Sequence, residues 1–176
     1  MCIAWLGLGS NVNAETHIRA GIGELEEQFG NVSLSPAYAS TAVGFDGDDF
    51  INLVARVETD MHPMELRQYL RDLEDRYGRN RDVPKFSDRS LDIDILLYDD
   101  LVLLSPLLEI PRAEILKFAH VLKPLADLEP DLIHPTEMRS MSEIWASSGL
   151  NDECLRLLSE FRYSDCGHHQ RPTPGQ

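Results

Sequence analysis

Residues 91–98 have the sequence Leu-Asp-Ile-Asp-Ile-Leu-Leu-Tyr, and they decide the fold because they are the most strongly marked β-strand of the chain. Side chains alternate across a strand, so Asp92 and Asp94 should point to one face of the sheet. The apolar side chains at the odd-numbered positions, from Leu91 to Leu97, should point to the other face. The sequence therefore predicts a strand with one buried face and two neighbouring carboxylates on the opposite face.

Apolar runs and helical stripes upstream of this strand predict its neighbours. The spacing of apolar residues predicts strands at 2–8, 32–40 and 50–59 and amphipathic helices at 14–29 and 63–77. The resulting order β-α-β-β-α-β is that of a ferredoxin-like core. We therefore expect an α+β protein whose antiparallel sheet has these helices on one face.

The segments downstream of the strand predict extra C-terminal helices. They are expected near 124–129, at 141–147 and at 151–161. The chain length fits a single domain, which we expect to span 1–162. Residues 163–176 are rich in His, Pro and Gly and predict a disordered tail.

The charge balance narrows the range of partners. The 176 residues include 16 Lys+Arg and 30 Asp+Glu, for a formal net charge of −14. This charge repels phosphate backbones and anionic lipid headgroups, which argues against nucleic acid and membranes as partners.

No stretch approaches the roughly 18 apolar residues of a membrane span, and the amino terminus has no basic leader region. The three cysteines match neither a disulfide framework nor a zinc-binding pair, so we expect a reduced, cytoplasmic protein.

The aspartate pair on the 91–98 strand is a candidate metal site. Two adjacent carboxylates repel each other, and a divalent cation that prefers oxygen ligands relieves this repulsion. Mg²⁺ is the expected ion at Asp92 and Asp94. The alternative is an ordinary solvated strand face.

The segment before this strand is basic although the chain is acidic. Residues 76–89 hold five basic side chains against two acidic ones. Arginine side chains make bidentate contacts with phosphate, and Gly78 and Pro84 favour a loop that can close over a polyphosphate. A basic loop followed by a metal-binding strand indicates phosphoryl transfer, whereas the alternative is a solubilising loop.

Phe50 and Asn52 should share a face of the 50–59 strand and place an aromatic ring beside an amide. A planar heterocycle could use both groups, although Phe50 could equally be a core residue and Asn52 a cap.

Gly7-Leu8-Gly9 is not a dinucleotide-binding fingerprint, and the sequence has no Walker-type loop. A nucleotide would therefore be bound in another way.

Two sequence strings carry a resemblance to a known family. They are Leu8-Gly9-Ser10-Asn11 and, at 88–96, Asp-Arg-Ser-Leu-Asp-Ile-Asp-Ile-Leu. The chain resembles the 6-hydroxymethyl-7,8-dihydropterin pyrophosphokinases of the folate pathway over about residues 3–135. The resemblance implies a ferredoxin-like fold and a transferase, which we expect to be a monomer with no partners other than its small-molecule substrates. It also implies transfer of pyrophosphate from ATP to the pterin hydroxymethyl group, with AMP as the leaving product.

The resemblance also implies roles for individual residues. The metal ligands for two Mg²⁺ ions would be Asp92 and Asp94. The ATP-binding residues would be Glu74, Arg79, Arg81, Lys85, Arg89, Ile95 and Arg112. The pterin-binding residues would be Asn11, Ser40, Val43, Phe50, Asn52 and His120. The two aspartates and the basic residues Arg79, Arg81, Lys85 and Arg89 would be catalytic.

Two departures from the family pattern leave alternatives open. Phe118 stands where the family has an arginine, and His120 stands where it has a second stacking aromatic residue. The alternatives are a paralogue that acts on another pterin or alcohol, and a pterin- or nucleotide-binding module with little turnover. A glycosyltransferase with an Asp-x-Asp motif fits less well, because the chain has no room for a nucleotide-sugar domain.

Overall fold

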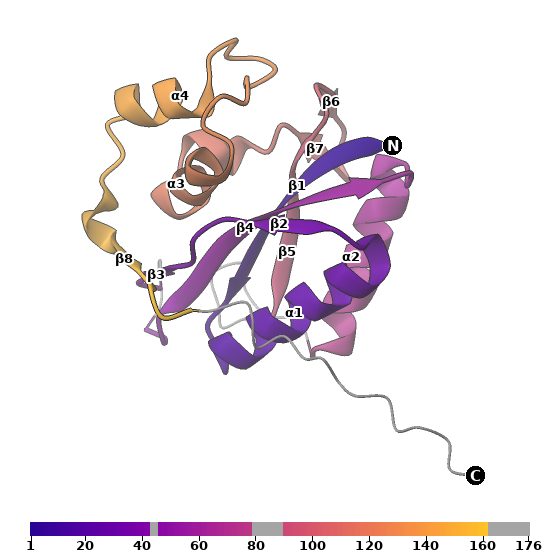
Figure 1. The fold of residues 1–176 in the computed structure, drawn as a ribbon, viewed down its shortest axis with the longest axis vertical. Helices are drawn as coiled ribbons and strands as arrows, with labels where there is room; N and C mark the ends of the chain where they lie inside the picture. The colour runs from indigo at the N-terminus through magenta and orange to yellow at the C-terminus, as the bar shows by residue number, and fades with distance from the viewer. Residues whose placement is uncertain (43–45, 79–89, 162–176) are drawn as a thin grey trace.

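An antiparallel sheet with helices on both faces forms the body of the protein (Figure 1). The computed structural model describes residues 1–42, 46–78 and 90–161. The elements are β1 (Cys2–Ser10), α1 (Ala14–Phe29), β2 (Val32–Leu34), β3 (Tyr38–Ser40), β4 (Phe50–Thr59), α2 (Pro63–Arg76), β5 (Asp92–Tyr98), β6 (Leu103–Leu104), β7 (Glu109–Ile110), α3 (Ala119–Leu128), α4 (Met141–Ser147) and β8 (Leu155–Leu157). Two 3₁₀ turns, η1 (Ala113–Leu116) and η2 (Asp152–Cys154), complete the described chain.

The strands of the main sheet lie in the order β5-β1-β4-β3-β8, and β2 also pairs with β4. Every pairing in this sheet is antiparallel. The α+β class and the antiparallel sheet predicted from the sequence are therefore confirmed. The observed bounds of α1, β4 and α4 are those predicted.

The strand predicted at 32–40 is divided into β2 and β3. The division falls at Ser35-Pro36, where the hydroxyl of Ser35 accepts a hydrogen bond from Val54 N at 2.8 Å. Leu34 pairs with Ala55 and Tyr38 pairs with Asn52, so three residues on one strand lie opposite two on the other. Pro36 has no N–H group to donate to a continuous ladder, which accounts for the break at this point.

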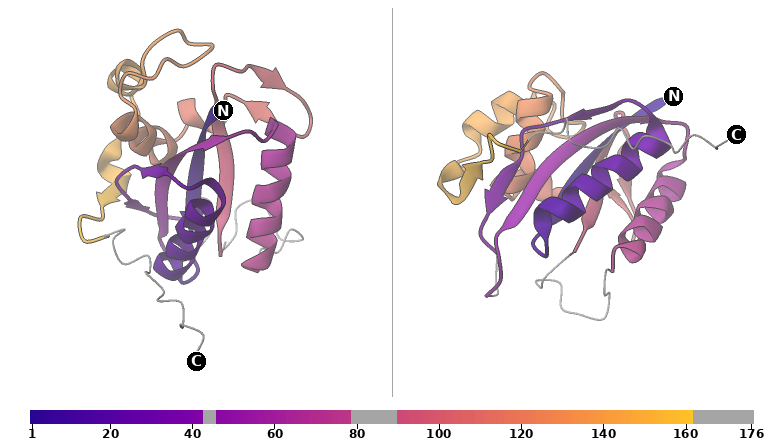
Figure 2. Two further views of the ribbon diagram at one scale, coloured as in Figure 1. Left: turned by 45° about the vertical axis from the view of Figure 1, so that its right-hand side comes forward. Right: turned by 60° about the horizontal axis from the view of Figure 1, so that its bottom comes forward.

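Helices α1 and α2 pack side by side on one face of the sheet, and α3 and α4 lie on the other (Figure 2). The first face buries the predicted apolar stripes, with Ile22 of α1 and Leu70 of α2 against Leu6 of β1. Helix α2 begins with Pro63 after a capping box formed by His62 and Glu65. The local sequence signals thus place both helices correctly.

The other face has its own core, and this core corrects one prediction. Leu97 was expected to share a face with Ile95, but it packs with Trp5 in the cluster that contacts α3 and α4. The register between β1 and β5 shifts at this point, so that Leu6 pairs with Ile95 and Trp5 pairs with Leu97. Leu96 is the extra residue of a β-bulge, which reverses the alternation after Ile95. The aspartates precede the bulge and keep the predicted alternation.

The helix predicted at 151–161 is wrong. The chain forms η2 and then β8, whose Arg156 pairs with Ala39 of β3. The unpaired edge of β3 offers backbone donors and acceptors that a returning strand can use, and this gain outweighs local helix propensity. The helix predicted near 124–129 begins earlier, at Ala119.

In the part of the chain that the structure describes, no helix is both long enough and apolar enough to cross a membrane. The predicted tail at 163–176 lies outside the described residues. The single domain at 1–162 remains a prediction.

Candidate active site

Gly9 of β1, which lies between β5 and β4, leaves part of the sheet without a covering side chain on the face that carries α3, and we call this uncovered part the bare strip. Gly9 pairs with Asp92 of β5 on one side and with Asn52 of β4 on the other. Because neighbouring strands lie about 4.8 Å apart, Asp92 and Asn52 stand about 10 Å from each other across Gly9. A Cβ atom on Gly9 would lie 3.6 Å from Asn52 Oδ1, so this strip is open only because the residue is glycine.

Gly7 lies two residues earlier on β1 and is covered. A Cβ atom on Gly7 would lie 3.3 Å from the side chain of Leu96, the residue that the β-bulge inserts. The bulge therefore fills the sheet surface over Gly7. The bare strip ends there, and Gly9 remains between the aspartate pair and Asn52.

Three of the predicted pterin-binding residues, Ser40, Phe50 and Asn52, lie at the β4 side of this strip. Asn52 is buried and donates through Nδ2 to Ser40 Oγ at 2.7 Å and to the Tyr38 carbonyl at 3.4 Å. These bonds occupy the amide nitrogen, so Oδ1 is the atom that faces Gly9. Phe50 lies two residues before Asn52 on the same face of β4, as predicted.

Asn11 follows the end of β1 and reaches the same end of the sheet. It is buried, and its Nδ2 donates to the Asp48 carbonyl at 3.3 Å. The preceding Ser10 pairs with Ile51 of β4, and its hydroxyl donates to the Ser90 carbonyl. These bonds hold the connections to β4 and β5 together around the strip. Val43, another predicted pterin-binding residue, lies outside the described residues.

His120 lies in the first turn of α3, and its ring stacks on Phe118. The ring centroids are 5.2 Å apart with an interplanar angle of 21°. Burial lowers the pKa of His120 from its ordinary value of 6.5, and the nearby Glu114 carboxylate opposes this shift. The two residues that depart from the family pattern therefore form one stacked pair. Contact of His120 with a pterin remains a prediction.

Asp92 and Asp94 lie on the other side of the strip. Both are half-buried, and the Ile93 side chain between them is buried on the opposite face, among the residues packed under α1 and α2. The guanidinium of Arg112 lies beside the pair, with Nη2 3.6 Å from Asp94 Oδ1.

The aspartate pair fits a magnesium site. No group of three or more His, Cys, Asp or Glu side chains suited to a metal occurs within residues 1–42, 46–78 and 90–161. Mg²⁺ does not require such a cage, because it commonly binds one or two carboxylates and takes its other oxygens from water and substrate phosphates. Two half-buried carboxylates beside the bare strip provide that arrangement.

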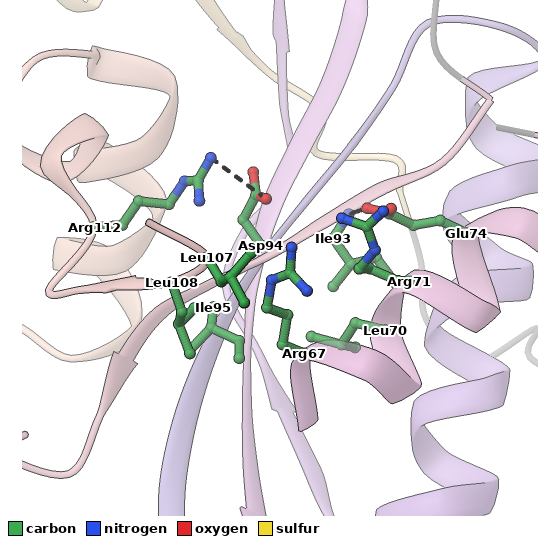
Figure 3. Close-up of a pocket in the computed structure, with 10 residues that line it drawn as sticks. All are labelled: Arg67, Leu70, Arg71, Glu74, Ile93, Asp94, Ile95, Leu107, Leu108 and Arg112. Carbon is green, nitrogen blue, oxygen red and sulfur yellow. Dashed lines mark hydrogen bonds and ion pairs between the residues drawn. The ribbon is translucent and has the colours of Figure 1, made fainter. Parts of the chain in front are cut away.

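A pocket opens on the outer side of β5, between α2 and the segment that includes Leu107 and Leu108 (Figure 3). Three arginines line it, Arg67 and Arg71 from α2 and Arg112 from the opposite side. The complete lining is Arg67, Leu70, Arg71, Glu74, Ile93, Asp94, Ile95, Leu107, Leu108 and Arg112. The cationic side chains around an apolar wall suit a ligand with both a phosphate part and a flat apolar part.

The pocket brings together three predicted ATP-binding residues: Glu74, Ile95 and Arg112. Glu74 is buried, and its Oε1 accepts a hydrogen bond from Ile93 N at 2.8 Å. This bond fixes α2 to the start of β5, so Glu74 has a structural role in the wall of the pocket. The predicted basic residues Arg79, Arg81, Lys85 and Arg89 lie outside the described residues.

Arg67 and Arg71 were missed by the sequence analysis. They are four residues apart on α2 and therefore share one face of the helix. That spacing is a usable signal, but it is also typical of a solvated helix face. Only the position of β5 and of Leu107 shows that both arginines line a pocket.

Comparison with known proteins identifies the family. The family model described as 7,8-dihydro-6-hydroxymethylpterin-pyrophosphokinase (HPPK) matches residues 5–130. The chain belongs to the HPPK family. This HPPK is therefore a transferase of the pyrophosphokinase class.

Three relatives show how the match extends along the chain. The chain is 35% identical over 159 residues to the 2-amino-4-hydroxy-6-hydroxymethyldihydropteridine pyrophosphokinase of Aquifex aeolicus, covering 89% of this chain and 99% of the relative. The protein of the same name from Pseudomonas aeruginosa is 36% identical over 147 residues, covering 81% of this chain and 90% of the relative. The folic acid synthesis protein fol1 of Schizosaccharomyces pombe is 33% identical over 163 residues, which are 90% of this chain but 22% of that protein.

Solved structures support the fold of this HPPK. The Plasmodium falciparum HPPK-DHPS wild-type structure superimposes with a TM-score of 0.67 at 15% sequence identity, over 82% of this chain and 44% of that chain. The triple mutant with pteroate superimposes with a TM-score of 0.70 at 13% identity, over 89% of this chain and 46% of that chain. This HPPK thus spans less than half of those chains and shares the fold of one part of them.

Proposed function

We propose that this HPPK transfers pyrophosphate from ATP to the hydroxymethyl group of 6-hydroxymethyl-7,8-dihydropterin and releases AMP, as a step of folate synthesis. One observation carries the proposal. The bare strip at Gly9 separates a side suited to a planar heterocycle, with Phe50 and Asn52, from a side suited to a charged nucleotide, with Asp92 and Asp94. Two substrates bound on the two sides would meet over the strip.

The nucleotide binds in the pocket beside β5 in this proposal. The apolar side chains of Leu70, Ile95 and Leu108 receive the base, and the arginines contact ribose or phosphates. The pocket includes Asp94, so a nucleotide that fills it extends its phosphates toward the aspartate pair. Charge-assisted hydrogen bonds from the guanidinium groups orient the triphosphate.

The aspartate pair supplies the metal ligands in this proposal. Asp92 and Asp94 would hold two Mg²⁺ ions, and the bound ions would neutralise triphosphate charge and align the reacting groups. The chain itself holds both carboxylates on a rigid strand with a fixed spacing along β5. Arg79, Arg81, Lys85 and Arg89 are proposed to add positive charge around the transferred group.

The pterin lies against Phe50 in this proposal and hydrogen-bonds with Asn52. Because Asn52 Nδ2 is engaged by Ser40, its Oδ1 accepts from an N–H group of the ligand. Asn11 lies on the same side, Val43 is proposed as a further pterin contact, and His120 covers the ring from α3. The hydroxymethyl oxygen then attacks the β-phosphorus and loses its proton to solvent as the new O–P bond forms. The bond from the β-phosphorus to the α-phosphate oxygen breaks, and AMP leaves with that oxygen. The bound substrates hold the oxygen in line with the breaking bond, and this orientation lowers the activation free energy of the transfer because the reactants are already positioned.

The stacked Phe118–His120 pair motivates a second candidate. In that case the same chemistry acts on a different pterin or another alcohol. A binding module with little turnover is the third possibility. These candidates differ in what they convert, so substrate dependence separates them.

We also infer a ferredoxin-like core and a cytoplasmic, monomeric enzyme. The sheet order β5-β1-β4-β3, with α1 and α2 on one face, supports the ferredoxin-like topology. The acidic net charge of −14 supports the expectation that neither nucleic acid nor membrane is a partner.

The test is AMP release from ATP and Mg²⁺, with and without 6-hydroxymethyl-7,8-dihydropterin. AMP formation that requires this pterin is the expected result. AMP formation that requires a different pterin or alcohol would favour the second candidate. Binding of pterin and ATP without AMP formation would favour a binding module.

A further inference from the structure

Arg112 lies between two carboxylates at the edge of the nucleotide pocket. Its Nη2 is 3.6 Å from Asp94 Oδ1, and its Nε is 3.2 Å from Glu114 Oε2. Its backbone N–H donates to the Leu96 carbonyl at 2.9 Å, which fixes the residue beside β5. The backbone of Arg112 is therefore fixed beside the strand that carries the proposed metal ligands.

The two contacts of the Arg112 side chain differ in kind. The contact with Glu114 is within hydrogen-bond distance, whereas the contact with Asp94 is an ion pair at a longer distance. The side chains of Arg112 and Asp94 are 30% and 36% exposed, so the pair is accessible from solvent. An accessible ion pair of this kind is weak and exchanges easily for a stronger partner.

The same carboxylate is a proposed metal ligand, so a guanidinium beside it affects cation binding. A divalent cation at Asp94 would be repelled by the positive charge of Arg112. A polyphosphate in the pocket would attract that charge, because guanidinium groups bind phosphate oxygens in a bidentate manner. The pocket lined by Arg67, Arg71 and Arg112 is where such a polyphosphate binds in the proposed function.

We infer that Arg112 is a resident counter-ion of Asp94 and exchanges this carboxylate for the nucleotide phosphates, so that the divalent cation enters with the nucleotide and not before it. The inference rests on the proposed function, because it requires a nucleotide in the pocket and a cation at the aspartate pair. The contact between Glu114 and Arg112 Nε is retained during the exchange, so the guanidinium rotates about this contact. Arg112 thus makes cation binding at Asp94 depend on the bound nucleotide, without itself contacting the cation.

The test measures Mn²⁺ binding by electron paramagnetic resonance of the free ion, with and without α,β-methylene-ATP. The Arg112→Met variant removes the charge and keeps an unbranched side chain of moderate length. Arg139→Met is the matched control, because it removes the same charge from a side chain whose partners, Glu137 and Ser147, are outside the pocket. Arg112→Lys retains the charge, and a thermal melt of each variant confirms that it is folded.

We expect the wild type to bind Mn²⁺ weakly alone and tightly with the analogue. Arg112→Met should bind Mn²⁺ alone roughly threefold to tenfold more tightly than Arg139→Met, since an accessible ion pair is worth at most about one decade. Its affinity for the analogue should fall by roughly tenfold. Arg112→Lys should behave like the wild type in the experiment without nucleotide.

Two results would overturn the inference, and they are distinguishable. If the wild type takes up Mn²⁺ with the analogue but Arg112→Met and Arg139→Met bind Mn²⁺ alone equally well, Arg112 is not the counter-ion and the proposed function stands. If the wild type takes up no Mn²⁺ even with the analogue, the proposed function fails together with this inference.

Discussion

Replacement of Gly9 by alanine should separate stability from activity. Gly9 lies near the end of β1, where it pairs regularly with β4 and β5, so alanine adopts its extended backbone conformation without strain. The new Cβ would lie 3.6 Å from Asn52 Oδ1 and 3.9 Å from Phe50 Cδ1, which are ordinary contact distances. Because glycine in a strand costs about 0.5–1 kcal/mol relative to alanine, the variant should be more stable by about that amount.

The activity of Gly9→Ala should fall in spite of this gain. The methyl group stands on the strip where the two substrates are proposed to meet, between Asp92 and Asn52. Overpacking of a well-fitted site costs about 1–3 kcal/mol, which corresponds to a loss of roughly fivefold to 150-fold in kcat/KM. The assays are urea unfolding for stability and AMP release for activity.

Gly7→Ala is the matched control on the same strand. Its Cβ would lie 3.3 Å from Leu96 Cδ2, within the packed core and away from the strip. It should therefore change the free energy of unfolding and leave kcat/KM within about twofold. Unchanged kcat/KM in Gly9→Ala, or equal losses in both variants, would refute the placement of the reaction over Gly9.

Three further predictions follow from individual side chains. Asp94→Asn should abolish turnover with little loss of melting temperature, because it removes a metal ligand from a self-repelling pair; a large drop in melting temperature would indicate a structural role instead. Glu74→Gln should lower the free energy of unfolding by about 1.5–3 kcal/mol in urea titrations, since it weakens the buried bond from Ile93 N, and an unchanged midpoint would contradict that role. Burial lowers the pKa of His120 from 6.5, so its contribution to stability is present above pH 6.5 and lost as pH falls through the folded pKa. His134 titrates in the same direction, so the wild type must be compared with His120→Phe in thermal melts between about pH 5 and 7.5; parallel curves would count against the buried, neutral His120.

Local sequence signals were sufficient where a segment's own periodicity decides its structure. The predicted bounds of α1 and β4 match because the apolar residues of each segment recur with the period of its own helix or strand. The Asp92–Asp94 alternation was predictable for the same reason. The bulge at Leu96 was not, because it depends on the register between β1 and β5.

The remaining differences arise from contacts between distant segments. The last strand, β8, forms only because β3 offers an open edge more than a hundred residues earlier in the chain. Likewise, Arg67 and Arg112 meet around one pocket although they are far apart in sequence. Neither pairing has a signature within a short window. The sequence therefore predicts the motifs of the candidate site. It does not predict which residues from distant segments line the pocket beside those motifs.

Transfer of isotope from labelled ATP tests the central claim most directly. ATP labelled with ³²P at the β position, or in a parallel reaction at the γ position, is incubated with the enzyme, Mg²⁺ and 6-hydroxymethyl-7,8-dihydropterin, and the products are separated. If pyrophosphate is transferred, the β label in one reaction and the γ label in the other should each appear on the pterin, and the released nucleotide should be unlabelled AMP in both. Appearance of the γ label alone on the pterin with labelled ADP, or of both labels as free pyrophosphate, would contradict this claim.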